Sequence, residues 1–446
     1  MPERAASTAG ETPHRAGYAW FVVAVLSLLQ IGSYIDRQVI NLLVEPMRRD
    51  FGITDTQVSL LLGFAFAAFY AVMAVPIGRL ADTYSRVALI VGCVLFWSGA
   101  TLWCMFADGY WSLFFARMLV GLGEAGLAPA AFSILGDYFR PGRLARATSC
   151  LTGASFVGSG LALALGGIVI GRLPAEAFVS LPLVGEVRTW QLAFGFASLP
   201  SLAVLMLFFL VREPARRGGG PATDRASMAE IIRYLRSDAS LWLAVFAGMS
   251  FCNAFQYGLT AWIPTFFVRT YGWAPSEIGQ YYGACFLICG TLGTLTGGLL
   301  CDYLFDRFGR AAFLMMPLIS ASICLPLVIA FALSGNGTAS AALLVPLTFV
   351  ATMAFGATIA SIPSLAPNRM RAQLVAAYML LGTIVGQGGG PWLIAVFTDY
   401  AARDPALIRY SIAVVSPVLL AFAATILWNG IRAVARTAPA ASAAQT

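Results

Sequence analysis

Long apolar runs recur along almost the whole chain, and they constrain its fold more than any other feature of the sequence. Of the 446 residues, 59% are hydrophobic and only 11% are charged, whereas soluble domains are about 45–50% apolar and about 25% charged. A membrane-spanning helix needs about 20 mostly apolar residues. Because lipid offers no partners to open backbone groups, such runs cross a membrane as helices. The composition therefore predicts an all-α polytopic membrane protein.

Twelve of these runs are long enough to cross a bilayer. We expect spans at 18–43, 57–78, 87–107, 110–137, 147–171, 190–211, 240–267, 277–301, 311–333, 340–362, 374–398 and 407–432. The polar residues 1–16 do not resemble a signal peptide, so the first run should remain as an anchor. If the N-terminus lies inside, nineteen arginines fall in inner segments and seven in outer segments. Because cytoplasmic loops carry the excess of basic residues, this bias predicts that both termini are cytoplasmic.

Four charged residues lie inside runs that otherwise read as membrane spans. Asp36 and Arg37 belong to the first run, and Arg117 and Glu124 to the fourth. A charge at membrane depth costs about 2.5–3.5 kcal/mol on insertion scales, so these side chains should face protein or a water-filled path. The helical rise places Asp36 and Arg117 at about the same depth, roughly 10 Å from the outer surface. We therefore expect an Asp36–Arg117 pair, with Glu124 deeper and farther from arginine.

These charges have a functional and a structural interpretation. Glu124, with no arginine expected beside it, is the better candidate for a proton carrier, because burial favours the neutral form of a carboxyl group. Asp36 and Arg117 would then act as a gate that opens and closes with proton or anion binding. The alternative is a static buried pair that only fixes helix packing.

The sequence also repeats itself. Gly78, Asp82 and Arg86 follow the second run at a four-residue spacing, and Gly298 and Asp302 follow the eighth at the same Gly-to-Asp spacing. Equivalent loops after equivalent spans indicate two parallel six-helix repeats related by an axis along the membrane normal. The predicted parts are an N-terminal tail (1–17), a first half (18–211), a linker with an amphipathic helix (212–239), a second half (240–432) and a C-terminal tail (433–446). Both tails and the linker should be cytoplasmic.

The repeated Gly-x-x-x-Asp loop and the six-plus-six layout resemble the major facilitator superfamily across essentially the whole chain. Three stretches resemble its spinster branch, including bacterial members: Tyr34-Ile-Asp36-Arg37, the run from Arg117 to Glu124, and Pro367-Asn-Arg-Met-Arg-Ala with Gly386-Gln-Gly-Gly-Gly-Pro391. The resemblance implies twelve helices in two pseudo-symmetric halves. It also implies roles for Asp36, Arg117 and Glu124 in substrate and proton coupling.

The resemblance and the polar residues of the seventh and eleventh spans suggest the site residues. Expected substrate-binding residues are Tyr34, Arg37, Arg117, Glu124, Asn253, Gln256, Tyr257, Trp262, Tyr378 and Gln387. The aromatic ones could instead be packing or lipid contacts. Expected inner-gate residues are Gly78, Asp82, Arg86, Asp137, Asp302 and Arg310. A structural role in helix capping and membrane anchoring is an equally weighted alternative to the gate.

These features predict a secondary transporter that moves a lysolipid or a related amphipathic anion by alternating access, coupled to protons. A proton-coupled importer of a small organic or sugar acid is the alternative, and a non-transporting membrane receptor is a remote one. No Walker loop, GxSxG motif or metal-ligand cluster is present, so we expect no catalytic residue, no cofactor, no metal and no nucleic-acid partner. The expected setting is the bacterial inner membrane, with a monomer surrounded by lipid.

Overall fold

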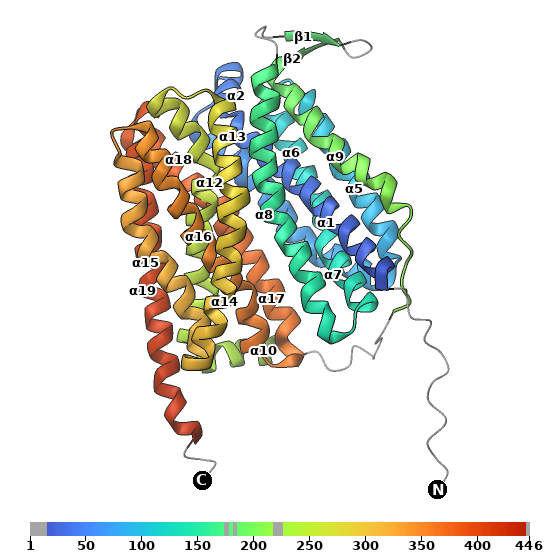
Figure 1. Ribbon diagram of the computed structural model, residues 1–446, viewed down its shortest axis with the longest axis vertical. Helices are drawn as coiled ribbons and strands as arrows, with labels where there is room; N and C mark the ends of the chain where they lie inside the picture. Colours follow the sequence, from blue (N-terminus) through green and yellow to red (C-terminus); the bar gives the residue numbers. More distant parts are fainter. Residues whose placement is uncertain (1–15, 174–177, 182–184, 217–225, 443–446) are drawn as a thin grey trace.

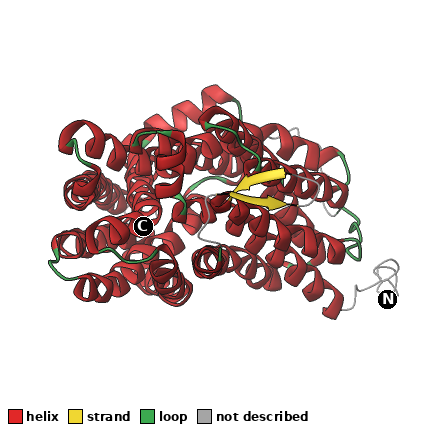
Figure 2. Ribbon diagram, turned by 90° about the horizontal axis from the view of Figure 1, so that it is seen from above, coloured by secondary structure: helices red, strands yellow, loops and turns green. Residues whose placement is uncertain are grey.

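The computed structural model describes residues 16–173, 178–181, 185–216 and 226–442. Two groups of helices lie side by side, one formed by the first half of the chain and one by the second (Figures 1 and 2). A short antiparallel pair of strands projects from one end of the bundle, which we call the hairpin end. Helix α1 begins and helix α19 finishes at the opposite end, which we call the terminus end (Figure 1).

The first half comprises helices α1 to α9 and the two strands. Their bounds are α1 Ala16–Gln38, η1 Val39–Leu42, α2 Val44–Phe51, α3 Asp55–Ser59, η2 Leu60–Phe64, α4 Ala65–Thr83, α5 Arg86–Met105, α6 Tyr110–Glu124, α7 Leu127–Tyr138, α8 Pro141–Arg172, β1 Phe178–Leu181, β2 Gly185–Arg188, η3 Thr189–Gln191 and α9 Leu192–Phe208. In the strand pair, Phe178 lies opposite Arg188 and Leu181 opposite Gly185.

The second half follows an amphipathic helix, α10 Met228–Ser237. Its elements are α11 Ala239–Leu243, η4 Ala244–Gly248, α12 Met249–Tyr271, α13 Pro275–Cys285, η5 Phe286–Gly290, α14 Thr291–Phe308, η6 Gly309–Ala311, α15 Ala312–Leu333, α16 Gly337–Leu365, α17 Asn368–Gly382, η7 Thr383–Gly389, α18 Gly390–Val396, η8 Phe397–Ala402, η9 Pro405–Leu407 and α19 Ile408–Ser442.

The helices cross the membrane twelve times, as predicted. By length and hydropathy, the described residues contain eleven stretches that could span a bilayer, and one of them, Pro275–Leu333, is 59 residues long. That stretch reverses at Gly309, whose φ of 56° suits glycine, and α14 then packs against α15. Divided there, the eleven stretches become twelve spans, six in each half. The all-α fold with two six-helix halves is therefore confirmed.

Local chemistry explains where several helices begin and break. Thr54 and Ser227 each form a capping box, with Gln57 and Glu230 respectively, which satisfies open backbone donors at the helix start. The predicted fourth span is broken after Glu124, between α6 and α7. Pro129 explains the break, because it has no N–H to donate to the carbonyl four residues earlier.

The last span extends beyond the boundary predicted from sequence, whereas the amphipathic helix does not. Helix α19 continues to Ser442, past the expected end of the last span at residue 432. Helix α10 lies where the amphipathic segment was expected and presents Ile231 to the protein while Met228 is exposed. The glycine linker 218–220 and the N-terminal tail up to residue 15, both predicted to be cytoplasmic, lie outside the described residues.

Candidate functional site

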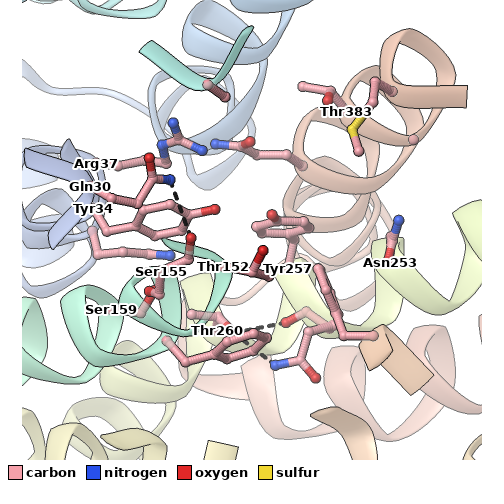
Figure 3. A pocket seen from close by; sticks show the side chains of 18 of the residues that line it. Gln30, Tyr34, Arg37, Thr152, Ser155, Ser159, Asn253, Tyr257, Thr260 and Thr383 are labelled. Atoms are coloured by element: carbon pink, nitrogen blue, oxygen red, sulfur yellow. Dashed lines mark hydrogen bonds between the residues drawn. The ribbon is translucent and has the colours of Figure 1, made fainter. Parts of the chain in front are cut away.

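A cavity of about 250 Å³ lies between the two halves. The first half contributes α1, α4, α7 and α8, and the second contributes α12, η5, α16, α17 and η7. Figure 3 shows polar side chains from both halves directed into it. Its polar lining residues are Gln30, Tyr34, Arg37, Gln38, Tyr70, Thr152, Ser155, Ser159, Asn253, Gln256, Tyr257, Thr260, Tyr378, Thr383 and Gln387. Among the described lining residues, Arg37 is the one that carries a charge.

The cavity is closed toward the hairpin end and accessible from the terminus end. Gln38 and Thr260, toward the hairpin end, are 6% and 3% exposed. Phe132 and Met379, closer to the terminus end, are 44% and 50% exposed. Figure 1 shows α8 and α14 leaning apart toward the terminus end. The structure is therefore one in which a substrate would reach the cavity from the terminus end.

Arg37 forms a buried ion pair with Glu124 at the wall of this cavity. Its Nη2 donates to Oε2 of Glu124 over 2.6 Å, and Ser33 Oγ donates to the same oxygen over 2.6 Å. The guanidinium carbon also lies over aromatic rings, 4.6 Å from the ring centre of Tyr34 and 4.3 Å from that of Phe66. Glu124 is thus held by a cation that is itself held by aromatic faces.

This pairing corrects the expectation that Glu124 lies farther from arginine than Asp36 does. Side chains on a helix lean toward its N-terminus, and α1 runs from the terminus end toward the hairpin end. Arg37 therefore reaches back toward the terminus end, to the depth of Glu124. The depth of a backbone position alone does not determine where an arginine binds, because the side chain is long and leans along the helix.

Arg117 contacts the backbone of the first span and makes no ion pair with the Asp36 carboxylate. It donates to the carbonyl oxygens of Asp36 and Arg37 over 3.1 and 3.4 Å. Helix α6 runs in the opposite direction to α1, so Arg117 leans toward the hairpin end and reaches the C-terminal carbonyls of α1. Those carbonyls lack regular helical partners and attract a cation. The equal depth was predicted correctly, but the expected side-chain pair is replaced by a cap on α1.

Asp36 is fully buried beside this cap and has few partners. Its Oδ2 accepts a hydrogen bond from Ser201 of α9 over 3.3 Å. Its Oδ1 has no hydrogen-bond partner among the described residues, and no ion pair involving Asp36 is found there either. Asp36 and Arg37 point to different neighbours, because consecutive residues of a helix lie about 100° apart. Asp36 faces α9, whereas Arg37 faces α6 and the cavity.

Most of the predicted substrate-binding residues lie at the cavity, but three do not. Tyr34, Arg37, Asn253, Gln256, Tyr257, Tyr378 and Gln387 line it. Arg117 and Glu124 lie behind its wall, in the charged cluster. Trp262 is buried between α12 and α18, where its Nε1 donates to the carbonyl of Pro391 over 2.9 Å. For Trp262, the packing interpretation is the correct one.

Other lining residues were not expected from the sequence. Thr152, Ser155 and Ser159 of α8 form a polar stripe, and Gln30 of α1 donates to Ser155 Oγ over 3.2 Å. Their three- and four-residue spacing places them on one helical face, which was a detectable signal within an apolar run. Gln38 and Tyr70 were also missed. No charge or motif distinguishes them from packing residues.

At the terminus end, Arg86 lies at the centre of a polar network formed by the first half and the residues that directly follow it. It forms ion pairs with Asp137 and, over 2.7 Å, with Glu213. Burial alone would raise the pKa of Glu213, but hydrogen bonds from the Val87 N–H, Arg86 and Ser85 outweigh it and lower the pKa. Asp82 is exposed in the preceding turn. Glu213 was not predicted, because it directly follows the sixth span and belongs to no motif.

At the hairpin end, charged and polar contacts join the two halves. Arg269 of α12 contacts Glu45 over 2.6 Å and Asp55 over 2.6 and 2.8 Å. Asp399 of η8 accepts from the backbone N–H and the hydroxyl of Thr56, over 2.7 and 2.6 Å. These contacts cover the cavity on that side. In the described residues, no group of three or more His, Cys, Asp or Glu side chains is placed to hold a metal ion.

Comparison with known proteins assigns the chain to a family. The sequence profile described as Major Facilitator Superfamily matches residues 26–391. The chain belongs to this superfamily. Its members are transporters, so the protein is a transporter and not an enzyme. The two six-helix halves and the cavity between them agree with that assignment.

The relatives place this superfamily member near the spinster branch, as predicted. An "MFS-type efflux pump" of Mycolicibacterium smegmatis is 28% identical over 409 residues, which cover 90% of each chain. "Protein spinster homolog 3" of Danio rerio is 28% identical, over 91% of this chain and 82% of the relative. A crystal structure of a bacterial homolog of the human lysosomal transporter Spinster, inward-facing and unoccupied, matches with a TM-score of 0.78. The two share 25% identity, and the match covers 95% and 98% of the two chains.

Proposed function

We propose that the protein is a secondary active transporter that moves a single-chain amphipathic anion, such as a lysolipid, by alternating access, driven by protons. The observation that carries this proposal is the position of Arg37. It is the charged residue of the described cavity wall, and it shares its guanidinium with Glu124. The cavity thus presents one cation, Arg37, among hydroxyl, amide and aromatic groups. The carboxyl group of its partner, Glu124, is of a type that can exchange a proton.

Arg37 is suited to hold the acidic headgroup. A guanidinium has five N–H donors in a planar fork, and the Nη2 contact to Glu124 uses only part of them. The Nε of Arg37 has no hydrogen-bond partner among the described residues. A phosphate or carboxylate at the cavity side could therefore bind Arg37 in a fork-like contact.

Asp36 is the proposed proton carrier in this conformation, together with Glu124 and Arg117 as coupling residues. An ionised carboxylate buried without an ion pair is strongly disfavoured, so we propose that Asp36 holds a proton here. Glu124, which contacts Arg37, would be ionised. When a substrate anion takes the place of Glu124 at Arg37, protonation of Glu124 would keep the cluster from gaining negative charge at membrane depth.

A transport assay in proteoliposomes with an imposed pH gradient tests this scheme. We expect the wild type to accumulate a radiolabelled lysophospholipid in response to the gradient. Asp36→Asn should retain substrate exchange without a gradient but lose gradient-driven accumulation, because the amide mimics only the protonated state. Glu124→Gln should remove the pH dependence of exchange. Glu277→Gln, at an exposed carboxylate of the other half, is the matched control and should behave as the wild type. Gradient-driven accumulation by Asp36→Asn would contradict the proposal.

A second candidate substrate is a small organic or sugar acid. The cavity volume of about 250 Å³ and the five lining amides, Gln30, Gln38, Asn253, Gln256 and Gln387, favour this alternative. Amides hydrogen-bond sugar hydroxyls as donors and as acceptors. Strong competition by a small sugar acid, without any effect of single-chain lipids, would favour this substrate over the amphipathic anion.

We further propose that the terminus end faces the cytoplasm, in the inner membrane of a bacterium, and that the protein works as a monomer. The support is the excess of arginines in segments at that end, nineteen against seven. A cysteine at exposed Arg233 of α10 should react only with reagents that enter the cell. A cysteine at exposed Arg49 should react from outside. The reverse pattern would overturn the orientation.

The same end is the proposed inner gate, formed by Gly78, Asp82, Arg86, Asp137, Asp302 and Arg310. Asp82, Asp302 and Arg310 are exposed. They have no ion pair within the described part of the chain. They are therefore free to form contacts when this end closes. Arg86 and Asp137, which are already paired within the first half, would support the gate from one side.

A further inference from the structure

We infer that three phenylalanines, Phe156, Phe286 and Phe355, form the binding site for the apolar tail of the substrate. We call them the aromatic trio. This inference rests on the proposed amphipathic anion and assigns the second part of its binding site. The trio belongs to α8, η5 and α16.

The trio is a continuous aromatic surface built by both halves of the protein. Phe156 of the first half stacks on Phe286 of the second, with ring centres 6.3 Å apart and planes 20° apart. Phe156 also meets Phe355 edge-on at 5.6 Å and 89°. All three line the cavity. An aliphatic chain lying on these rings would contact both halves at once.

Helix α8 separates this surface from the polar side of the cavity. Ser155 of its polar stripe faces α1, as the Gln30–Ser155 hydrogen bond shows. Phe156 lies one residue beyond Ser155, about 100° around the helix, and it contacts the second half. On α8, Ser155 thus faces the first half and Phe156 the second, and the hydroxyl of Thr152 lies about 40° from Phe156 at the border between them. This division matches a ligand with a polar head and an apolar tail.

The cavity size limits how much of a tail the trio can cover. Pockets that enclose drug-sized ligands measure about 300–1,000 Å³, and this one measures about 250 Å³. A headgroup and a short part of the tail fill it, so the rest of a long tail would extend beyond it. We therefore expect binding to tighten with chain length only until the trio is covered.

A series of n-alkyl phosphates from butyl to tetradecyl, below their micelle concentrations, tests the inference on the full-length protein in nanodiscs. For the wild type, the Kd should fall by up to about fourfold per methylene and then level off. Phe156→Ala should raise the Kd for dodecyl phosphate by about tenfold or more, because the buried ring contact is lost. The same substitution should change the Kd for butyl phosphate by less than about twofold. Retained binding of butyl phosphate also shows that the variant is folded.

Three further variants separate the tail site from other effects. Phe156→Leu, which keeps apolar bulk, should give an intermediate loss. Arg37→Gln should raise the Kd by a similar factor for alkyl phosphates of every chain length, because it removes the headgroup contact. Phe422→Ala is the matched control, since Phe422 is exposed and stacks on Phe251, which does not line the cavity. It should leave the whole series unchanged.

The outcomes distinguish this inference from the proposed function. If alkyl phosphates bind the wild type with a chain-length dependence that Phe156→Ala does not alter, the aromatic trio is not the tail site and the proposed function stands. If no alkyl phosphate binds at any length, the amphipathic anion is wrong and the tail site is rejected with it. A selective loss of long-chain binding in Phe156→Ala supports the assignment.

Discussion

The two ends of the bundle use charged side chains in opposite ways. At the hairpin end, Arg269 of the second half binds Glu45 and Asp55 of the first, so the ion pairs join the halves. At the terminus end, Arg86 binds Asp137 of the first half and Glu213, which directly follows the last helix of that half. The proposed alternating access would require the hairpin-end contacts to break and re-form. The terminus-end network can persist throughout, as part of one rigid half.

Glycine contacts reinforce this difference. Along the α8–α13 interface, a Cβ on Gly283 would lie 2.6 Å from the carbonyl oxygen of Gly160, so the two backbones nearly touch. A Cβ on Gly298, farther along in α14, would meet nothing within 4 Å. Small residues let membrane helices approach closely. The hairpin end is therefore closed by ion pairs and by close backbone packing between the halves.

The largest effect should follow from breaking the ion pair between the halves. Asp55 also forms an ion pair with Arg48 of its own half, over 2.9 Å. Arg269→Gln leaves Glu45 without its Arg269 partner and leaves Asp55 with Arg48 alone. Removing one partner of a buried pair costs up to about 3–5 kcal/mol, and here that cost falls on the closed hairpin end. We expect the equilibrium to shift toward a hairpin-open state. Arg86→Gln is the contrasting variant and should lower thermal stability without opening the hairpin end.

Spin labels at Arg49→Cys and Tyr400→Cys measure this opening. Both positions are exposed, at the hairpin end of opposite halves. The exposed native Cys150 would be replaced by serine. Pulsed electron paramagnetic resonance should show a longer distance population in Arg269→Gln and an unchanged one in Arg86→Gln. A longer population in both variants would show that the two ends do not differ in the way the structure indicates.

A smaller shift should follow from Gly283→Ala. The added methyl group pushes α8 from α13, and overpacking of this kind costs about 1–3 kcal/mol. Because this contact joins the two halves where the hairpin end is closed, we expect the same label pair to report partial opening. Gly298→Ala in α14, where the methyl group meets open space, should leave the distances unchanged. Equal distances in the Gly283→Ala protein and the wild type would show that the helices relax without separating.

The smallest effect concerns pH at the terminus end. The pKa of Glu213 is lower in the folded protein than in the unfolded chain. The ionised side chain therefore stabilises the folded protein, and this stabilisation is fully present at pH values above the unfolded pKa. It is lost as the pH falls through the folded value. Since this side chain is partly exposed, we expect less than about 1 kcal/mol. The Tm of the wild type should fall more between pH 6 and pH 3 than that of Glu213→Gln, with unchanged label distances. Identical pH profiles would exclude a role for Glu213.

Much of this organisation follows from the sequence alone. Each span depends on about 20 consecutive apolar residues, so hydropathy locates all twelve, and the repeated Gly-x-x-x-Asp loop reveals the two halves. The cost of a charge in lipid identifies Asp36, Arg37, Arg117 and Glu124 as buried residues, simply because they lie within apolar runs. These inferences succeed because they need only local composition and the properties of a bilayer.

Only the tertiary structure decided which groups these charges meet. Arg37 reaches Glu124 and Arg117 reaches backbone carbonyls because α1 and α6 run in opposite directions and their long side chains lean toward opposite ends. Likewise, Trp262 packs against Pro391, whereas Tyr257 on the same helix faces the cavity. The rotation and register of packed helices set these contacts, and they arise from many weak, nonlocal packing interactions. Residue types and spacing along one helix do not contain that information.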